Sequence, residues 1–258
     1  MVRNARVDLY DHVPRPVIAT GNDYSDGQVI EPHLHRRSQL LYAASGAAMV
    51  TTAHGTWVTP PQRAMWIPSG TVHQVRMLGA VNSHSLYFEP EAAAGMPDRC
   101  QVLGISPFMR MLLAEAVELP ADYELESRAD ALMALIQHEI RRLPTLPLSL
   151  PFPAHAALGD LCREFLVAPG PHETIDDWSA RLRMSRRAFT RLFRRETGQS
   201  FTAWRQQACL VAALPRLAAG ERVTSVALDL GYDNPAAFTA MFKRALGASP
   251  RDYLRRAG

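Results

Sequence analysis

A proline-rich stretch at residues 144–153 divides this chain of 258 residues into two parts with different patterns. Before this stretch, short apolar runs are separated by turn residues at intervals of about eight to twelve positions. After it, residues 154–258 have a helical pattern with glycines at the breaks. Because proline fixes φ and removes a backbone donor, we expect residues 144–153 to be a semi-extended linker. The sequence therefore predicts an α+β multidomain chain.

The first part combines a β-rich region with a shorter helical one. Its six clearest strand candidates are residues 39–43, 47–52, 55–59, 64–67, 73–77 and 84–88. This spacing is typical of an all-β sandwich or barrel, which we place in residues 1–92. From Ile105 onward apolar residues recur at three and four positions, which predicts amphipathic helices in residues 93–143. Their apolar faces either pack on the barrel or pair with a second subunit, and we expect this segment to support dimerisation.

Charge and composition limit the class of protein. Residues 1–150 carry a formal charge of −3 and residues 151–258 carry +6, an asymmetry that points toward nucleic acid. No apolar run approaches the ~18 residues of a membrane span, and the first ten residues lack the apolar core of a signal peptide. We therefore expect a cytoplasmic protein without a membrane partner, whose three cysteines are free thiols.

The second part contains two candidate helix-turn-helix units, at residues 174–196 and 223–247. In the first, Thr174 and Ser185 are suited to begin helices and Gly198 to end one. Apolar residues such as Phe189 form one stripe of the second helix, whereas Arg187, Thr190, Arg191 and Arg194 share another face. A short helix, a tight turn and a helix with outward-facing arginines is the arrangement that places a recognition helix in the major groove.

The second unit repeats the pattern about fifty residues later, with Pro235 suited to the first turn of its second helix. Helix 201–219 connects the two units, and Pro215 inside it predicts a bend near 211–215.

Five blocks within residues 154–258 closely resemble the DNA-binding domain of the AraC/XylS family of bacterial transcription regulators: Met184-Ser-Arg-Arg, Arg191-Leu-Phe-Arg-Arg-Glu-Thr-Gly198, Val226-Ala-x-x-x-Gly-Tyr232, Phe238-x-x-x-Phe-Lys243 and Gly247-x-Ser-Pro250. The resemblance implies base contacts from the first unit at Arg187, Thr190 and Arg191. We add Arg186 and Arg194 of the same helix as candidate DNA-binding residues. For the second unit the matching positions are Pro235, Ala236, Ala237 and Ala240, and we add Asn234, Lys243 and Arg244 as candidate DNA-binding residues. That second set departs from many members by being poor in hydrogen-bonding side chains, although alanine can contact a thymine methyl and Lys243 and Arg244 can reach phosphate.

The β-rich region contains His33-x-His35, Gln39, Gly46, Pro68-x-Gly70 and His73. Histidines two apart on one strand point to the same side. The spacing resembles the two cupin motifs, with Gln39 where metal-binding cupins usually carry glutamate. The resemblance implies a metal at His33, His35, Gln39 and His73, with Zn, Ni, Fe or Cu as the candidates for an imidazole-rich site. The alternative is that these histidines only hydrogen-bond a ligand or close the barrel. Tyr42, Trp57 and Trp66 are candidates to line an effector pocket.

These observations predict a ligand-responsive, sequence-specific DNA-binding transcription regulator and not an enzyme. The expected partners are a double-stranded DNA operator, a small-molecule or metal effector, a second copy of the chain and RNA polymerase. Residues 38–46 and 60–68 look like an AraC-type subgroup that often regulates a neighbouring transporter gene; a catabolic gene is the other candidate target. The alternative function is a cupin metalloenzyme, an isomerase or dioxygenase, with a DNA-binding tail. Gln39 in place of glutamate disfavours it, because a catalytic cupin needs a general acid or base nearby.

Overall fold

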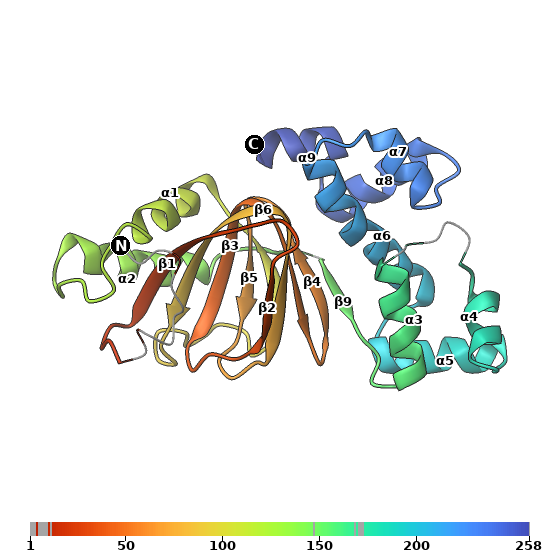
Figure 1. Cartoon of the computed structure of the whole chain (residues 1–258), viewed down its shortest axis with the longest axis horizontal. Coiled ribbons are helices and arrows are strands. Elements are labelled where there is room, and N and C mark those ends of the chain that lie inside the picture. The colour runs from red at the N-terminus through yellow and green to blue at the C-terminus, as the bar shows by residue number, and fades with distance from the viewer. Residues whose placement is uncertain are drawn as a thin grey trace. The chain divides into compact units, whose positions relative to one another are not determined.

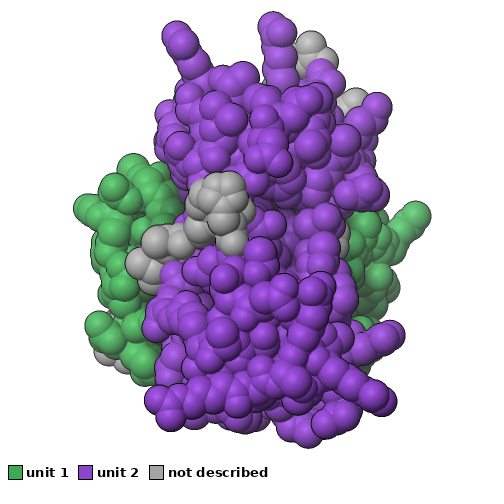
Figure 2. All heavy atoms as spheres, turned by 90° about the vertical axis from the view of Figure 1, so that its right-hand side faces the viewer, with its two compact units in different colours: residues 1–52, 58–146 green, residues 53–57, 147–258 purple. Residues whose placement is uncertain are grey.

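The computed structural model of the chain describes residues 4, 10, 12–146, 148–167, 169 and 173–257 (Figure 1). They form two compact units, which are coloured separately in Figure 2. The first unit comprises residues 1–52 and 58–146, and the second comprises residues 53–57 and 147–258. No helix among the described residues is long and apolar enough to cross a membrane.

The first unit is built on an antiparallel sheet with the strand order β1-β6-β3-β5-β7-β8, and β2 also pairs with β6. The bounds of these strands are β1 Val17–Tyr24, β2 Val29–His33, β3 Ser38–Thr52, β5 Arg63–Ile67, β6 His73–Phe88, β7 Gln101–Gly104 and β8 Thr145–Leu146.

Two long strands replace four of the predicted short ones. Strand β3 joins 39–43 to 47–52, and β6 joins 73–77 to 84–88. The pairing of β3 with β6 shifts register on both sides of Ser45, and the adjacent Gly46 has a φ of +68°. A Cβ atom at Gly46 would lie 2.3 Å from the carbonyl oxygen of Ala80. Gly46 thus allows an irregularity in a continuous strand where the sequence suggested a turn.

Helices α1 (Pro107–Ala116) and α2 (Arg128–Ile140) begin at Ser106 and Ser127, whose hydroxyls accept hydrogen bonds from backbone amides of the first turn. Their apolar stripes pack on one face of the sheet, where the buried cluster includes Val17, Leu40, Tyr42, Trp66, Leu86, Phe88, Met109, Leu113, Met133 and Ile136. Of the two expectations for these faces, packing on the barrel is therefore confirmed. The same helices still expose Phe108, Met111 and Leu135.

The predicted segments 93–143 and 144–153 both contain strands in addition to what the sequence indicated. Residues 93–143 are not wholly helical, because β7 lies among them and pairs with β5. The division between the two units falls after Leu146, inside the predicted linker 144–153. Parts of this linker are paired as strands, because β8 pairs with β7 and β9 (Ser149–Pro151) pairs with β4 (Gly55–Thr59). Pro147 lies outside the described residues. Residues 145–146 and 149–150 lie between the prolines of this stretch and keep their backbone N–H groups. They can therefore pair at the edges of the sheet, which are positions that tolerate proline.

The second unit is mainly helical, and the tip of β4 with β9 belongs to it. The indole Nε1 of Trp204 donates to the carbonyl oxygen of Pro151 at 3.1 Å, which holds β9 against the helices. The bounds of the helices are α3 Ala156–Val167, α4 Ile175–Arg181, α5 Arg186–Thr197, α6 Phe201–Ala218, α7 Val223–Asp229, α8 Pro235–Leu246 and α9 Pro250–Ala257. Helix α6 continues through Pro215, and the bend expected there stays a prediction.

Each predicted helix-turn-helix unit forms around its own aromatic core. Trp178 of α4 is fully buried in the first, in edge contacts with aromatic rings that include Phe189, Phe193, Phe201 and Trp204. In the second, Phe238 and Phe242 of α8 pack with Tyr232 and Tyr253. Burial of these rings fixes which faces of α5 and α8 remain exposed to solvent.

Candidate nucleic-acid interface and metal centre

The first helix-turn-helix unit is defined by local hydrogen bonds. Thr174 caps α4 in a capping box: its hydroxyl accepts from the backbone amide of Asp177, and the Asp177 carboxylate accepts from the amide of Thr174 at 2.8 Å. The hydrogen bond from the Thr174 hydroxyl lowers the pKa of the Asp177 carboxyl. Arg183 has a φ of +53° in the turn, and Ser185 then caps α5 by accepting from the amide of Ala188. The local sequence therefore fixes where α5 begins.

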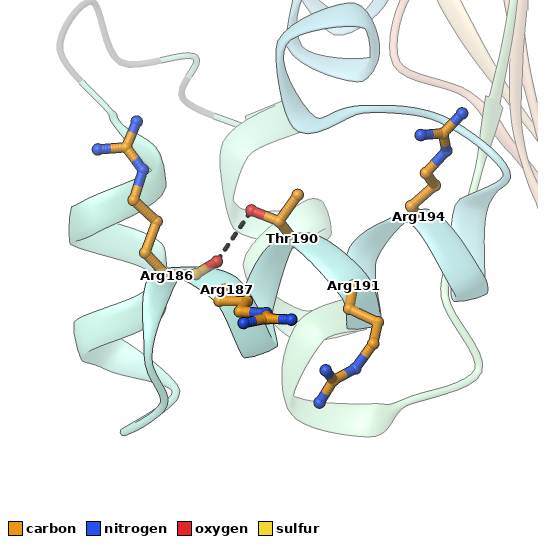
Figure 3. A pocket seen from close by; sticks show the side chains of 5 residues that line it. All are labelled: Arg186, Arg187, Thr190, Arg191 and Arg194. Carbon is orange, nitrogen blue, oxygen red and sulfur yellow. Dashed lines mark hydrogen bonds between the residues drawn. The ribbon is translucent and has the colours of Figure 1, made fainter.

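Helix α5 presents a basic face. Five residues line an open hollow of about 620 Å³ on it, namely Arg186, Arg187, Thr190, Arg191 and Arg194 (Figure 3). All five are exposed, whereas Phe189, Leu192 and Phe193 are buried on the opposite side of the helix. The structure thus brings together all five residues predicted for the first unit.

The four arginines on this face differ in their surroundings. Arg186 is held by Asp176 of α4, with Nη1 and Oδ2 3.2 Å apart, and its carbonyl oxygen accepts from the Thr190 hydroxyl at 2.9 Å. No carboxylate among the described residues pairs with Arg187, Arg191 or Arg194. In Figure 3 the side chains of Arg187 and Arg191 extend on one side of the helix, away from that of Arg186. Arg187 and Arg191 therefore combine exposure with an unneutralised charge.

Helix α8 presents a different face. Asn234 caps it, with Oδ1 accepting from the backbone amide of Ala236 at 2.7 Å, so this oxygen has a structural role. Ala236 and Ala240 are exposed, as are Lys243 and Arg244 in the last turn. The predicted residues of the second unit therefore lie on α8 or at its N-cap. The two alanines present methyl groups in the first half of the helix, and Lys243 and Arg244 present positive charges in its last turn. The polarity difference expected between the two recognition helices is present in the structure.

Three histidines meet at one end of the barrel sheet. His33, the last residue of β2, pairs with His73, the first residue of β6. His35 completes the group: one ring nitrogen from each histidine lies within 4.8 Å of the other two. The ring centroids of His33 and His73 are 4.3 Å apart, and that of His35 lies 4.8 Å from His33. The structure thus brings together three of the four residues predicted as metal ligands.

Hydrogen bonds indicate which ring nitrogen carries a proton in two of these histidines. The Nδ1 atom of His33 lies 2.7 Å from the carbonyl oxygen of Glu31, and that of His73 lies 2.8 Å from the carbonyl oxygen of Thr71. Because a carbonyl oxygen only accepts, each Nδ1 atom carries a proton, and in the neutral form of each ring the lone pair is then on Nε2. Histidines that bind metals usually donate their other ring N–H in this way.

His73 has the most restricted environment of the three. Its residue is 1% exposed, and its Nε2 atom is buried without a hydrogen-bond partner in the described part of the chain. Burial lowers the pKa of His73, and the neighbouring His33 lowers it further against the opposing effect of the Thr71 carbonyl. A neutral imidazole with a buried lone pair is the form that a metal ion requires, so these residues fit the group that the motif implies.

Gln39 is linked to the histidines through β6. Its Nε2 atom donates to the hydroxyls of Ser85 and Tyr87, both at 3.2 Å, and the Tyr87 ring contacts that of His35 with centroids 5.2 Å apart. The Gln39 Oε1 atom is buried with no partner among the residues described. Ser85 and Tyr87 were missed by the sequence analysis. Alternation along residues 84–88 could have placed them on one face, since Tyr87 pairs directly with Gln39.

The aromatic residues proposed for the effector pocket do not join this group. Tyr42 and Trp66 belong to the cluster that packs under α1 and α2, and Trp66 Nε1 donates to the carbonyl oxygen of Pro97 at 2.9 Å. Adjacent positions of a strand point to opposite faces, so Tyr42 lies on the face opposite to Gln39. Tyr42 and Trp66 are therefore separate from the histidines, and their role in an effector pocket stays a prediction. Trp57 is buried on β4 opposite Ser149, and its role stays a prediction.

Comparison with known proteins gives matches to both units. A family model for AraC-like ligand binding domains matches residues 15–149, and a model for helix-turn-helix domains matches residues 178–256. The chain is 36% identical to the HTH-type transcriptional regulator NimR of Escherichia coli (strain K12), over 87% of this chain and 82% of NimR. It is 30% identical to the HTH-type transcriptional regulator RipA of Corynebacterium glutamicum, over 43% of this chain and 33% of RipA.

Among solved structures, the chain is similar to ToxT from Vibrio cholerae O395, crystallised with (E)-4-(8-methylnaphthalen-1-yl)but-3-enoic acid. The match has 12% sequence identity, covers 95% of this chain and 100% of ToxT, and has a TM-score of 0.40.

Both sequence relatives are named as transcriptional regulators, which favours a regulator over the cupin metalloenzyme considered as the alternative. The ligand-binding model alone covers more than half of the chain, and the similarity to NimR extends through both units. The chain belongs to the AraC family of transcriptional regulators, with an AraC-like ligand-binding domain followed by a helix-turn-helix DNA-binding domain.

Proposed function

We propose that α5 and α8 read two adjacent parts of one operator half-site, and that α5 provides the hydrogen-bonding base contacts. The observation that carries this proposal is the hollow on α5, where Arg187 and Arg191 are exposed without a carboxylate partner in the described structure. A guanidinium group can donate two hydrogen bonds to O6 and N7 of guanine in the major groove. Arg186 is paired with Asp176, so its guanidinium group is less available for a DNA contact than those of Arg187 and Arg191.

The test begins with sequencing the DNA fragments that the purified full-length protein retains, which gives the operator consensus. Affinities of Arg191→Ala are then measured on the consensus duplex and on a scrambled duplex at one fixed salt concentration, since phosphate contacts depend steeply on salt. We expect a loss of about 1–3 kcal/mol on the consensus and a smaller loss on the scrambled duplex.

Arg195→Ala is the matched control, because Arg195 lies on the same helix but outside the hollow and pairs with Glu196 at 2.8 Å. It removes the same charge and should not change sequence preference. If Arg191→Ala lowers the affinity for both duplexes by the same factor, Arg191 contacts phosphate and not a base.

We also propose that His33, His35 and His73, with Gln39 beside them, hold one divalent transition metal ion in the barrel. The support is the closeness of the three ring nitrogens and the buried Nε2 atom of His73. An imidazole-rich donor set suits Zn, Ni, Fe or Cu, and the ion would supply a positively charged coordination point for an effector. Elemental analysis should find near-stoichiometric metal in the wild type and none in His35→Ala.

His84→Ala is the control for the metal site, because His84 lies on β6 beside Tyr42 and outside the cluster. A metal-free wild type that still responds to its effector would leave the histidines as pocket lining, which is the alternative role.

A second copy of the chain is the protein partner that we propose. The exposed fractions of Phe108, Met111 and Leu135 are 49%, 69% and 38%, and all three lie on α1 or α2. Pairing through these helices would place two DNA-binding units on one operator and raise affinity through effective concentration. A regulator that acts at bacterial promoters also needs the cytoplasm as its compartment and RNA polymerase as a partner. In vitro transcription from the selected operator tests the polymerase contact and distinguishes activation from repression.

A further inference from the structure

We propose that the histidine cluster is completed by a small monoanion of the carboxylate class, which is the group through which the effector binds. This inference rests on the proposed metal site and specifies the charge of the additional ligand that the metal ion would bind. It follows from the absence of any anionic donor among the described residues of the cluster. His33, His35 and His73 make up the group of potential metal ligands there, and no carboxylate or thiolate belongs to it.

The donor set is neutral. The Nδ1 atoms of His33 and His73 each face a backbone carbonyl oxygen, so a metal ion would be bound through Nε2, and an imidazole that binds a metal through Nε2 is uncharged. Gln39 contributes an uncharged amide, whose Nε2 atom is already engaged by Ser85 and Tyr87. A divalent ion bound by these groups would keep its full charge of +2.

The acids nearest along the chain do not compensate this charge. Glu31 contributes its backbone carbonyl oxygen to His33, and its residue is exposed to solvent. The Glu89 carboxylate, two residues beyond Tyr87, lies 2.6 Å from Arg36 and 2.7 Å from the buried Arg37. Its charge is therefore already paired.

An uncompensated charge in a partly buried site is costly, and an anion from solution lowers that cost. The Nε2 atoms of His73 and His35 are buried, whereas the residue His33 is half-buried, so His33 marks the side on which the cluster is nearest to solvent. Three-histidine sites for zinc commonly keep a fourth position for an exchangeable ligand. The ligand class that fits is a monoanion with an oxygen donor, and a neutral molecule of the same shape lacks the charge that the site needs.

The experiment uses the full chain loaded with Co²⁺, whose visible absorption reports changes in coordination. Acetate and acetamide are titrated separately at constant ionic strength held with perchlorate, and calorimetry of the Zn²⁺-loaded protein gives the affinities. We expect saturable binding of acetate to the metal-loaded chain, none to the metal-free chain, and none for acetamide.

Two substitutions at Gln39 distinguish the effect of adding a negative charge from the effect of removing the amide group. Gln39→Glu supplies the missing anion from the chain, so it should bind Zn²⁺ more tightly and acetate at least about tenfold more weakly. Gln39→Leu removes the amide without adding charge and should keep acetate binding. Zn²⁺ affinity is measured for each variant by competition with a chelator.

The outcomes distinguish the two proposals. A chain that takes up no stoichiometric metal overturns the metal site and this inference together. A chain that binds metal but responds equally to acetate and acetamide, or to neither, overturns the anion alone. Acetate binding that is as tight in Gln39→Glu as in the wild type would also overturn it.

Discussion

Arg183 and Gly231 occupy the same position in the two helix-turn-helix units, and both have a positive φ, +53° and +81°. Each follows the residue that ends the first helix of its unit, Leu182 after α4 and Leu230 after α7. The backbone amide of Arg183 donates to Ala180, and that of Gly231 donates to Leu228. The two turns therefore share one geometry, although only the second has the residue that adopts it without strain.

We predict that Arg183→Gly stabilises the DNA-binding unit by about 0.5–1 kcal/mol. Glycine removes the cost of holding an L-residue in the left-handed region, and part of this gain is offset because glycine loses more backbone entropy on folding. Urea unfolding followed by tryptophan fluorescence measures the change, since Trp178 is buried in this unit. Arg183→Ala is the control, because it removes the guanidinium group and keeps the Cβ atom. Equal gains in both variants would assign the effect to charge instead of φ.

The alanine-rich face of α8 leads to a prediction about DNA chemistry. Ala236 and Ala240 are exposed near the N-terminal half of α8, where apolar contact with thymine methyl groups is the available base readout. Replacing thymine by uracil in the α8 part of the selected operator should weaken binding by about 0.8 kcal/mol per contacted methyl, a factor of about four. The same replacement in the α5 part should have little effect. Equal losses in both parts, measured by titration of labelled duplexes, would contradict this division of roles.

The buried His73 predicts how the stability of the metal-free barrel depends on pH. Its pKa is lowered in the folded state, mainly by burial, so the unfolded chain takes up a proton first as the pH falls. The contribution of His73 is therefore fully present above the ordinary pKa of about 6.5 and is lost as the pH falls through the lower folded value. The rings of His33 and His35 face that of His73, with centroids 4.3 Å and 5.4 Å away.

Urea unfolding between pH 8 and pH 5, after removal of metal with a chelator, measures this dependence. His73→Gln should show a smaller loss of stability at acid pH than the wild type. An identical pH dependence in the two proteins would mean that other groups cause the loss.

The exposed residues on α1 predict the oligomeric state. We expect the wild type to sediment as a dimer and Met111→Glu to sediment as a monomer, because a charge would be buried at the contact. The variant should also lose up to about 10²–10⁴ in affinity for an operator with two half-sites. Leu228→Glu is the control for sedimentation, since Leu228 is 55% exposed but lies on α7. A wild type that sediments as a monomer would end the dimer proposal.

The helical unit and its basic face could be predicted from local sequence patterns alone. Thr174, Ser185 and Gly198 act within a few residues of the backbone groups that they satisfy, so their effect is visible in the sequence. Residues three and four apart lie on the same face of a helix, so the geometry of α5 alone places four predicted side chains on one surface, namely Arg187, Thr190, Arg191 and Arg194. Contacts of this kind need no knowledge of the rest of the chain.

The residues that accompany the histidines could not be predicted in this way, because long-range packing places them there. Gln39 and Tyr42 lie on the same strand, and the sequence does not specify which face α1 and α2 will cover. Once these helices pack against Tyr42 and Trp66, the opposite face is left with Gln39, Ser85 and Tyr87. The closeness of His33 to His73 likewise depends on the register between β2 and β6, which long-range pairing sets. Periodicity and capping are local, whereas the choice of face and register depends on segments that meet only when the chain has folded.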